Sequence, residues 1–470
     1  MAKSINLIIV PPPRLGHLSI VELGNVLLRR DERFSVSVLV INPPFMAEGL
    51  FAKKLSDSHP AINFIDIPRV DPSPLLSNPP MASEAFISSY IELHKPNVRA
   101  AVERLLLKDE FASTIFVVDM FCTSMLDVAR GFGSPCYTFF ASSAAFLGLL
   151  QLLSARSVFS EGDPDSLIPA YAHPVPTSVM PNFVFRKDGY EAFAAIGEQI
   201  RETNGVILNT FADLEPHALR SFGDGCPPLY PIGPVLDLVG PNQVLETDIS
   251  ESNRILRWLD EQEEEESVVF LCFGSIGSFK ADQVAEIAAG LDNSRVKFLW
   301  SLRKPPQPGK SEWTLDYEDP NDILPEGFLA RTEGRGLICG WAPQAKILAH
   351  KSVGGFVTHC GWNSILESIW FGVPTATWPL YAEQQVNAFQ MVKDLELAVE
   401  LKMDYRRHQQ ALLSAVEVEN AVKLLMSVDG HGLEMRKRVK KMSERSRAAV
   451  AKQGSSYETI GALINKMLDS

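Results

Sequence analysis

Residues 341–384 read WAPQAKILAHKSVGGFVTHCGWNSILESIWFGVPTATWPLYAEQ, and this stretch contains the pattern that decides the fold. The apolar run 355–358 predicts a short buried strand, His359-Cys360-Gly361 a tight turn, and the spacing of apolar residues over 362–371 a helix. The first N–H groups of such a helix have no partner within it and lie at the positive end of its dipole. The strand–turn–helix unit therefore predicts an anion site, to which His359 adds a donor.

Other residues of the stretch suit the remaining parts of a nucleotide sugar. Trp341 offers a flat face for a base, and Glu367 can accept two hydrogen bonds from a ribose diol. Glu383 and Gln384 follow a predicted strand over 375–378, at the edge where open α/β sheets bind ligands. Their side chains are suited to sugar hydroxyls.

Taken one at a time, these residues also have structural interpretations. Ser364 and Glu367 fit an S-x-x-E capping box. A lone Trp before Pro usually belongs to the core, and a lone His at a strand end is usually only hydrogen-bonded. Taken together, they resemble the signature box of plant family-one UDP-glycosyltransferases, which opens with Trp, has H-C-G-W-N-S in its middle and closes with an acidic residue and Gln. The 44 residues from Trp341 to Gln384 equal that box in length.

The resemblance implies an α/β protein of the GT-B fold, in which two Rossmann-like domains with parallel sheets face a central cleft. The first domain would hold the acceptor and the second the UDP-sugar. The turn 274–278 would face the diphosphate. The residues implied to contact the donor are Ser275, Trp341, Ala342, Gln344, His359, Gly361, Trp362, Asn363, Ser364, Glu367, Tyr381, Glu383 and Gln384.

A base is needed when a hydroxyl attacks an anomeric carbon, and histidine suits that role near neutral pH. His17 stands where the loop after a predicted strand over 7–10 enters a helix, at the carboxyl edge of the sheet. Its structural alternative is a cap of that helix. Asp119 ends the predicted strand 114–118 and can accept from the second ring nitrogen, fixing the tautomer and stabilising the imidazolium. Both positions match the catalytic pair of the resembled family.

The chain in order supports two domains, since apolar strands alternate with helices as in parallel sheets. We expect an acceptor domain over 1–235, a linker over 236–253 that is rich in Pro and Gly, and a donor domain over 254–453, with the last helix, about 454–470, packing back on the first domain as the resemblance implies. Further predicted segments are strands at 35–41, 62–67, 136–140, 206–209, 268–273, 297–302 and 336–339, helices at 83–107, 281–291 and 432–468, and an exposed loop at 303–324.

Composition restricts the partners. The net charge of −13 argues against nucleic acid, and six dispersed cysteines without a C-x-x-C pair indicate a reducing compartment. The short apolar run at the amino terminus is too brief for a signal peptide, and no segment is apolar enough for a membrane span. We therefore expect a cytoplasmic protein, a monomer with no integral membrane association. Asp163-Pro164-Asp165 mimics a D-x-D metal motif but lies in a Gly- and Pro-containing loop, so we expect no metal.

In family terms, the reaction transfers glucose from UDP-glucose, with inversion, to a hydroxyl of a small lipophilic phenolic, flavonoid or terpenoid. Two alternatives are a nucleotide-sugar epimerase, which would change the sugar without an acceptor, and a non-catalytic carrier, which would bind a phenol and leave the nucleotide sugar intact. The acceptor itself cannot be named, because aromatic residues such as Phe121, Phe140, Phe146 and Phe185 are by default core. Arg14 replaces a glycine that relatives commonly carry in the first loop.

Overall fold

The computed structural model describes residues 4–13, 19–44, 50–76, 80–107, 111–156, 158–238, 249–306, 315–406 and 412–469. The chain divides into two compact units. Unit 1 comprises 1–174, 182–245 and 448–470, and unit 2 comprises 175–181 and 246–447. The short segment 175–181 thus belongs by its contacts to unit 2, although the chain on both sides of it belongs to unit 1.

Among the described residues of unit 1, seven strands form a parallel sheet in the order β3-β2-β1-β4-β5-β6-β7. Both faces of this sheet are buried, since Leu7 and Ile9 pack into one apolar cluster and Ile8 and Val10 into another. This explains why the strands are apolar throughout rather than alternating. The strands are β1 Ser4–Val10, β2 Phe34–Ile41, β3 Asn63–Ile67, β4 Phe111–Asp119, β5 Cys136–Phe140, β6 Gly205–Leu208 and β7 Leu229–Pro231.

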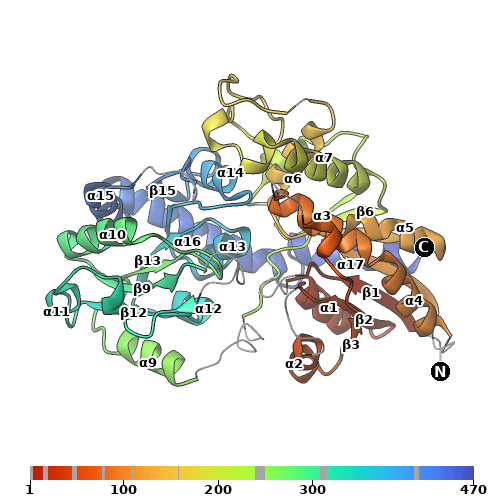
Figure 1. Cartoon of the computed structure of the whole chain (residues 1–470), viewed down its shortest axis with the longest axis horizontal. Helices are drawn as coiled ribbons and strands as arrows, with labels where there is room; N and C mark the ends of the chain where they lie inside the picture. The colour runs from red at the N-terminus through yellow and green to blue at the C-terminus, as the bar shows by residue number, and fades with distance from the viewer. Residues whose placement is uncertain are drawn as a thin grey trace. The chain divides into compact units, whose positions relative to one another are not determined.

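Helices cover the two faces of this sheet, and the last helix of the chain is one of them (Figure 1). The residues Ile460, Leu463, Ile464 and Met467 of α17 are buried in the same cluster as Leu7 and Ile9 of β1. The helices of unit 1 are α1 Ser19–Arg30, α2 Leu50–Ser58, α3 Ser83–Leu93, α4 Lys95–Leu106, α5 Leu126–Gly131, α6 Ala144–Leu153, α7 Lys187–Arg201, α8 Pro216–Arg220 and α17 Ser455–Leu468, with short 3-10 turns η1 Ser73–Leu75, η2 Met120–Met125 and η4 Asn182–Phe185.

In the described part of unit 2, six parallel strands form a sheet in the order β12-β9-β8-β13-β14-β15. The strands are β8 Val268–Cys272, β9 Lys297–Ser301, β12 Gly336–Cys339, β13 Val353–Thr358, β14 Thr375–Thr377 and β15 Ala398–Glu400. The helices are α9 Ile249–Asp260, α10 Ala281–Ser294, α11 Phe328–Arg331, α12 Gln344–Leu348, α13 Trp362–Phe371, α14 Gln384–Phe389, α15 Ala415–Met426 and α16 Gly430–Val450, with the 3-10 turns η3 Thr177–Val179 and η6 Pro320–Asp322 and the π-helical turn η7 Gln390–Asp394.

Four predicted segments differ from the structure. The helix expected over 432–468 is two, α16 and α17, because a turn over 451–454 ends at Gly454, the N-cap of α17. The single helix expected over 83–107 is two, α3 and α4, because Pro96 is tolerated only in the first turn of a helix and a new helix begins at Lys95. The expected loop 303–324 contains a small antiparallel pair, β10 Arg303–Lys304 with β11 Leu315–Asp316. The expected linker 236–253 overlaps the first turn of α9, and its residues 239–248 lie outside the described part of the chain.

None of the described helices is long and apolar enough to span a membrane.

Candidate active site

The sheet of unit 2 brings the predicted donor residues to one edge. β8 and β13 are neighbours in its order, and the chain leaves β8 toward β9 but leaves β13 toward β14, in the opposite direction. Ligands bind beyond the carboxyl ends of strands at such a point. The predicted residues follow those ends: Ser275 follows β8, Trp341, Ala342 and Gln344 follow β12, His359, Gly361, Trp362, Asn363, Ser364 and Glu367 follow β13, and Tyr381, Glu383 and Gln384 follow β14.

The ring of His359 is held between two glycines. A Cβ atom added to Gly274 would lie 2.7 Å from Nε2 of His359, and one added to Gly361 would lie 2.6 Å from the same atom. Both distances are too short for any other residue, so the two backbones approach the imidazole from the loops after β8 and β13. His359 is 7% exposed, and Cys360 beside it takes a positive φ of 63° to complete the predicted tight turn. Gly274 and Gly361 thus fix the position of the Nε2 atom of His359.

Helix α13 begins as predicted at Trp362. Its N-cap is Gly361, which has no side chain to cap the helix, and the first N–H groups lie at the positive end of the dipole. The capping-box interpretation of Ser364 and Glu367 is wrong, because both lie inside the helix. A true capping box occurs elsewhere, at Ser414 of α15.

Gln344 connects α12 to α13. Its Nε2 donates to Oγ of Ser364 at 2.9 Å and to Oε2 of Glu367 at 2.7 Å. Ser364 and Glu367 are both buried, and the side-chain amide of Gln344 orients the carboxylate of Glu367. Trp341, three residues before Gln344, is half-buried at the end of β12.

Gln384 is held by the backbone that precedes it. Its Oε1 accepts from the N–H groups of Leu380 at 2.9 Å and Tyr381 at 3.1 Å. Nε2 has no hydrogen-bond partner among the described residues. A side chain bound in this way can still donate to a ligand through Nε2. We therefore expect Gln384 to donate a hydrogen bond to a sugar hydroxyl rather than to accept one.

In unit 1, Asp119 stands where β4 ends beside β1. Val10 and Val118 are register partners, and the sheet order changes direction at this pair of strands. Asp119 is buried, and its Oδ1 accepts from the N–H of Phe121 at 3.0 Å. Cys122 approaches the carbonyl of Pro11, so η2 lies against the end of β1. His17 and Arg14 lie outside the described residues.

Comparisons with known proteins agree with this arrangement. Residues 233–431 match the family model described as UDP-glucoronosyl and UDP-glucosyl transferase. UDP-glucose flavonoid 3-O-glucosyltransferase 6 of Fragaria ananassa is 43% identical, covering 100% of both chains, and anthocyanidin 3-O-glucosyltransferase 6 of Manihot esculenta is 48% identical over 81% of this chain and 98% of its own. The chain belongs to this family of UDP-glycosyltransferases. Among solved structures, UGT71G1 of Medicago truncatula in complex with UDP-glucose has a TM-score of 0.88 and 40% identity, covering 99% of this chain and 98% of its own.

Membership confirms the predicted fold class. The two parallel sheets are the Rossmann-like sheets of a GT-B UDP-glycosyltransferase, and the protein is an enzyme of that class. No group of three or more His, Cys, Asp or Glu residues within the described ranges is arranged to hold a metal ion. Asp163, from the D-x-D look-alike, pairs with Arg156 at 2.9 Å.

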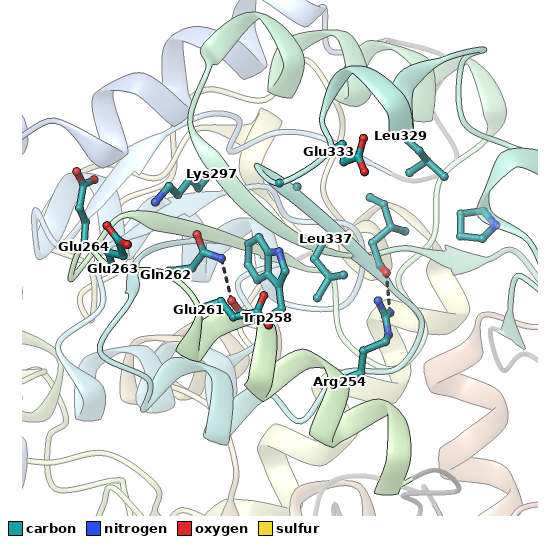
Figure 2. Close-up of a pocket in the computed structure, with 14 residues that line it drawn as sticks. Arg254, Trp258, Glu261, Gln262, Glu263, Glu264, Lys297, Leu329, Glu333 and Leu337 are labelled. Atoms are coloured by element: carbon teal, nitrogen blue, oxygen red, sulfur yellow. Dashed lines mark hydrogen bonds between the residues drawn. The ribbon is translucent and has the colours of Figure 1, made fainter.

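A pocket of about 840 Å³ in unit 2 of the glycosyltransferase lies away from these residues. It opens between α9 and the first residues of β9 and β12, at the amino edge of the sheet, opposite to the carboxyl edge. Figure 2 shows Trp258 and Leu337 at its centre, with Arg254 donating to the carbonyl of Ile338 at 3.0 Å. The pocket contains none of the predicted donor residues, so the candidate active site is the edge and not this pocket.

Sequence reasoning missed the residues of α14 whose hydrogen bonds hold the turn beside His359 and the backbone of Tyr405. Asn387 donates from Nδ2 to the carbonyl of Cys360 at 3.1 Å, which ties α14 to the turn beside His359. Gln385 donates to the carbonyl of Tyr405 at 3.0 Å. The only signal in the sequence was position, since Asn387 follows Gln384 by three and lies on the same face of α14.

Proposed function

We propose that the protein transfers glucose from UDP-glucose to a hydroxyl of a small lipophilic plant metabolite, with inversion at the anomeric carbon, to give a β-O-glucoside. The observation that carries the proposal is the carboxyl edge of the second sheet. There a buried histidine between two glycines, a helix start whose N-cap is a glycine, and an oriented glutamate are the groups that a UDP-sugar needs. The solved relative in complex with UDP-glucose supports the same donor.

Each donor group has a role in this proposal. His359 and the N–H groups at the start of α13 stabilise the diphosphate, whose charge grows as UDP leaves. Ser275, in the glycine-containing turn after β8, contacts the same phosphates. Trp341 stacks on uracil, and Glu367, oriented by Gln344, accepts from the ribose hydroxyls. The remaining implied contacts, Ala342, Tyr381 and Glu383, complete the binding of nucleotide and sugar. These groups carry the charge of the leaving group without a metal.

The catalytic step is proposed to use His17 and Asp119. His17 removes the proton of the acceptor hydroxyl while its oxygen bonds to C1 of glucose and the bond from C1 to the UDP oxygen breaks on the opposite face, which inverts C1. Asp119 accepts from the other ring nitrogen and stabilises the imidazolium. Burial of this carboxylate at the end of β4 supports the role.

The acceptor class rests on relatives and on side chains near Asp119. Two relatives are named for flavonoid or anthocyanidin 3-O-glucosylation, which favours a flavonoid. Phe121 is half-buried, and its ring lies 5.8 Å from that of Phe193. Phe140 and Phe146 are fully buried and pack on each other, so they form core, as their default interpretation held.

The test of this function is a product analysis. Purified protein, treated with a chelator, is incubated with UDP-glucose and a panel of flavonoids, simple phenols and terpenoid alcohols, and products are detected by mass spectrometry. The anomeric proton coupling in the NMR spectrum of an isolated product reports its configuration. We expect β-glucosides and no change of the sugar without an acceptor. An α-glucoside, or an epimerised nucleotide sugar, would contradict the proposal.

Two variants test the catalytic pair. His17→Ala is expected to lose at least about 10²-fold in rate, the scale of general-base catalysis, while it keeps its UDP affinity. Asp119→Asn is expected to lose less with acidic phenols than with aliphatic alcohols, since phenols need less help in deprotonation. Both are followed by initial rates and by calorimetric titration with UDP. Wild-type turnover of an alcohol by folded His17→Ala would show that the base is another group.

A further inference from the structure

The segment 175–181, which we call the strap, lies in unit 2 although its chain neighbours belong to unit 1. Its 3-10 turn η3 packs against α14. That helix begins with Gln384, the residue proposed to donate to the sugar, so the strap lies against the element that presents the proposed sugar contact.

A buried arginine fixes the strap in this place. Arg406 is 7% exposed, and its Nη2 donates to the carbonyl of Ser178 at 3.0 Å and to that of Met180 at 2.5 Å. A buried guanidinium is costly unless its N–H groups are bonded, and here the acceptors are main-chain carbonyls from more than two hundred residues earlier in the chain. Apolar side chains could hold the strap in place without burying a charge. The two hydrogen bonds from Arg406 are directional, so they also fix which carbonyl groups of the strap face the arginine.

The residue before Arg406 connects it to the sugar side. The carbonyl of Tyr405 accepts from Nε2 of Gln385, and the ring of Tyr405 lies 5.8 Å from that of Trp378, just after β14. Gln384 and Gln385 are adjacent in the first turn of α14. A shift of that turn when the sugar binds would therefore be felt at Tyr405 and Arg406.

The chain after the strap leads to aromatic residues near Asp119. It continues directly into η4, where the ring of Phe183 lies 3.9 Å from that of Phe193. The Phe193 ring in turn lies 5.8 Å from that of Phe121, two residues after Asp119. The strap is thus hydrogen-bonded to Arg406 and continues covalently into η4, where a row of packed rings begins that ends at Phe121, beside the proposed catalytic carboxylate.

We propose that Arg406 is a positioning residue that couples sugar binding at Gln384 to the acceptor-side aromatic residues Phe183, Phe193 and Phe121 through the strap. This inference rests on the proposed function, and it adds a determinant of acceptor binding that touches neither substrate. Coupling through such a packed chain is expected to be modest, about 2- to 30-fold in binding.

Unit 2 also supplies a matched control. Arg436 is 6% exposed, and it too donates to two main-chain carbonyls, those of Leu425 and Ser427. It joins α15 to α16 and also pairs with Glu266 at 3.3 Å, and none of its hydrogen-bond or ion-pair partners among the described residues lies in the strap or in α14. Loss of Arg436 removes a buried arginine of the same kind without touching the proposed coupling.

The experiment compares Arg406→Ala and Arg406→Lys with Arg436→Ala. For Arg406→Ala we expect the KM for the acceptor to rise about tenfold and the UDP affinity to stay within about twofold of the wild type. We also expect a larger fraction of the consumed UDP-glucose to react with water instead of the acceptor. Arg436→Ala should lower the melting temperature and leave the acceptor KM unchanged. Arg406→Lys keeps a charged donor and should lie between wild type and Arg406→Ala, so it is informative if the alanine variant does not fold. Equal rises of KM in Arg406→Ala and Arg436→Ala, or no rise in either Arg406 variant, would overturn the proposal.

Hydrogen exchange separates this proposal from the proposed function. In the wild type, UDP-glucose but not UDP is expected to slow exchange at 182–193, and the Arg406 variants should lose that difference. If no acceptor is glucosylated, the proposed function fails while this readout still tests the strap. If UDP-glucose changes nothing at 182–193 in the wild type, the coupling is refuted whatever the enzyme transfers.

Discussion

At the scale of single residues, the position of His359 depends on what its neighbours lack. Gly361 has an ordinary φ of −63°, so alanine is permitted by the backbone, but its Cβ would lie 2.6 Å from Nε2 of the ring. The ring must then move. We predict that Gly361→Ala weakens UDP binding about tenfold, equivalent to about 1.4 kcal/mol, as measured by calorimetry.

The control for this substitution is Gly223→Ala, where an added Cβ would meet nothing within 4 Å and the backbone needs no positive φ. It should bind UDP as the wild type does. Gly274→Ala should be worse than Gly361→Ala, because its φ of +75° adds backbone strain to the same collision. Unchanged UDP affinity in a folded Gly361→Ala protein would mean that the imidazole does not contact the diphosphate.

Gln384 supports a second prediction at this scale. Glutamate at this position keeps an oxygen for the N–H groups of Leu380 and Tyr381, but its second oxygen cannot donate to a sugar hydroxyl. Gln384→Glu should therefore lower the affinity for UDP-glucose by about 10- to 100-fold, the scale of a hydrogen bond lost at a buried group, and change that for UDP much less. Titrations with both ligands make the comparison, and equal losses for the two would remove Gln384 from the sugar site.

The sequence predicted which residues line the edge, because the signature box fixes residue types at fixed spacings. It did not predict how Ser364 and Glu367 are held. Ser364 and Glu367 fit a capping box equally well, and only the position of Gln344 decides that both face α12. These two hydrogen bonds join residues 20 and 23 positions apart, which is too far for a local sequence pattern to predict them.

At the scale of elements, the sequence predicted the strands and helices in which apolar residues recur with a clear spacing, and it missed the shortest elements. The two-residue strands β10 and β11 are too brief to have any period. The break between α3 and α4 was readable from Pro96, yet the apolar spacing continues across it and conceals it. In such cases tertiary contacts decide what a weak local signal leaves open.

Helix α6 shows how a distant residue completes an element. The buried carboxylate of Glu215 accepts from the N–H groups of Ala144 and Ala145, at 2.9 and 3.0 Å, at the positive end of the helix. Glu215→Gln replaces one acceptor by a donor that faces another donor. We predict a loss of about 1 to 3 kcal/mol in the free energy of unfolding, measured by urea denaturation. Glu191→Gln, at an exposed site on α7, should cost at most a few tenths of a kcal/mol, and equal effects of the two would refute this role for Glu215.

At the scale of the whole molecule, alternation of strands and helices predicted two parallel sheets, whereas the place of the last helix came only from the family resemblance. Nothing in the period of 455–468 distinguishes packing on unit 1 from packing on unit 2. The structure places Ile460, Leu463 and Ile464 in the core of unit 1, and Ser456 donates to the carbonyl of Gly233 at 2.6 Å. The last helix of the chain therefore covers part of one face of the first sheet.

This arrangement predicts that stability and donor binding can be separated. Leu463 is 0% exposed in the core of unit 1, so Leu463→Ala should cost about 2 to 5 kcal/mol of unfolding free energy. The proposed donor residues all belong to unit 2, so the affinity of the folded variant for UDP should be unchanged. Urea denaturation and calorimetry at a temperature where the variant remains folded measure the two quantities. Leu424→Ala, at a leucine of α15 that is 38% exposed, is the matched control and should cost well under half as much. If Leu463→Ala weakened UDP binding as much as it weakened the fold, the donor site would depend on the last helix, and the separation of the two units in binding would be wrong.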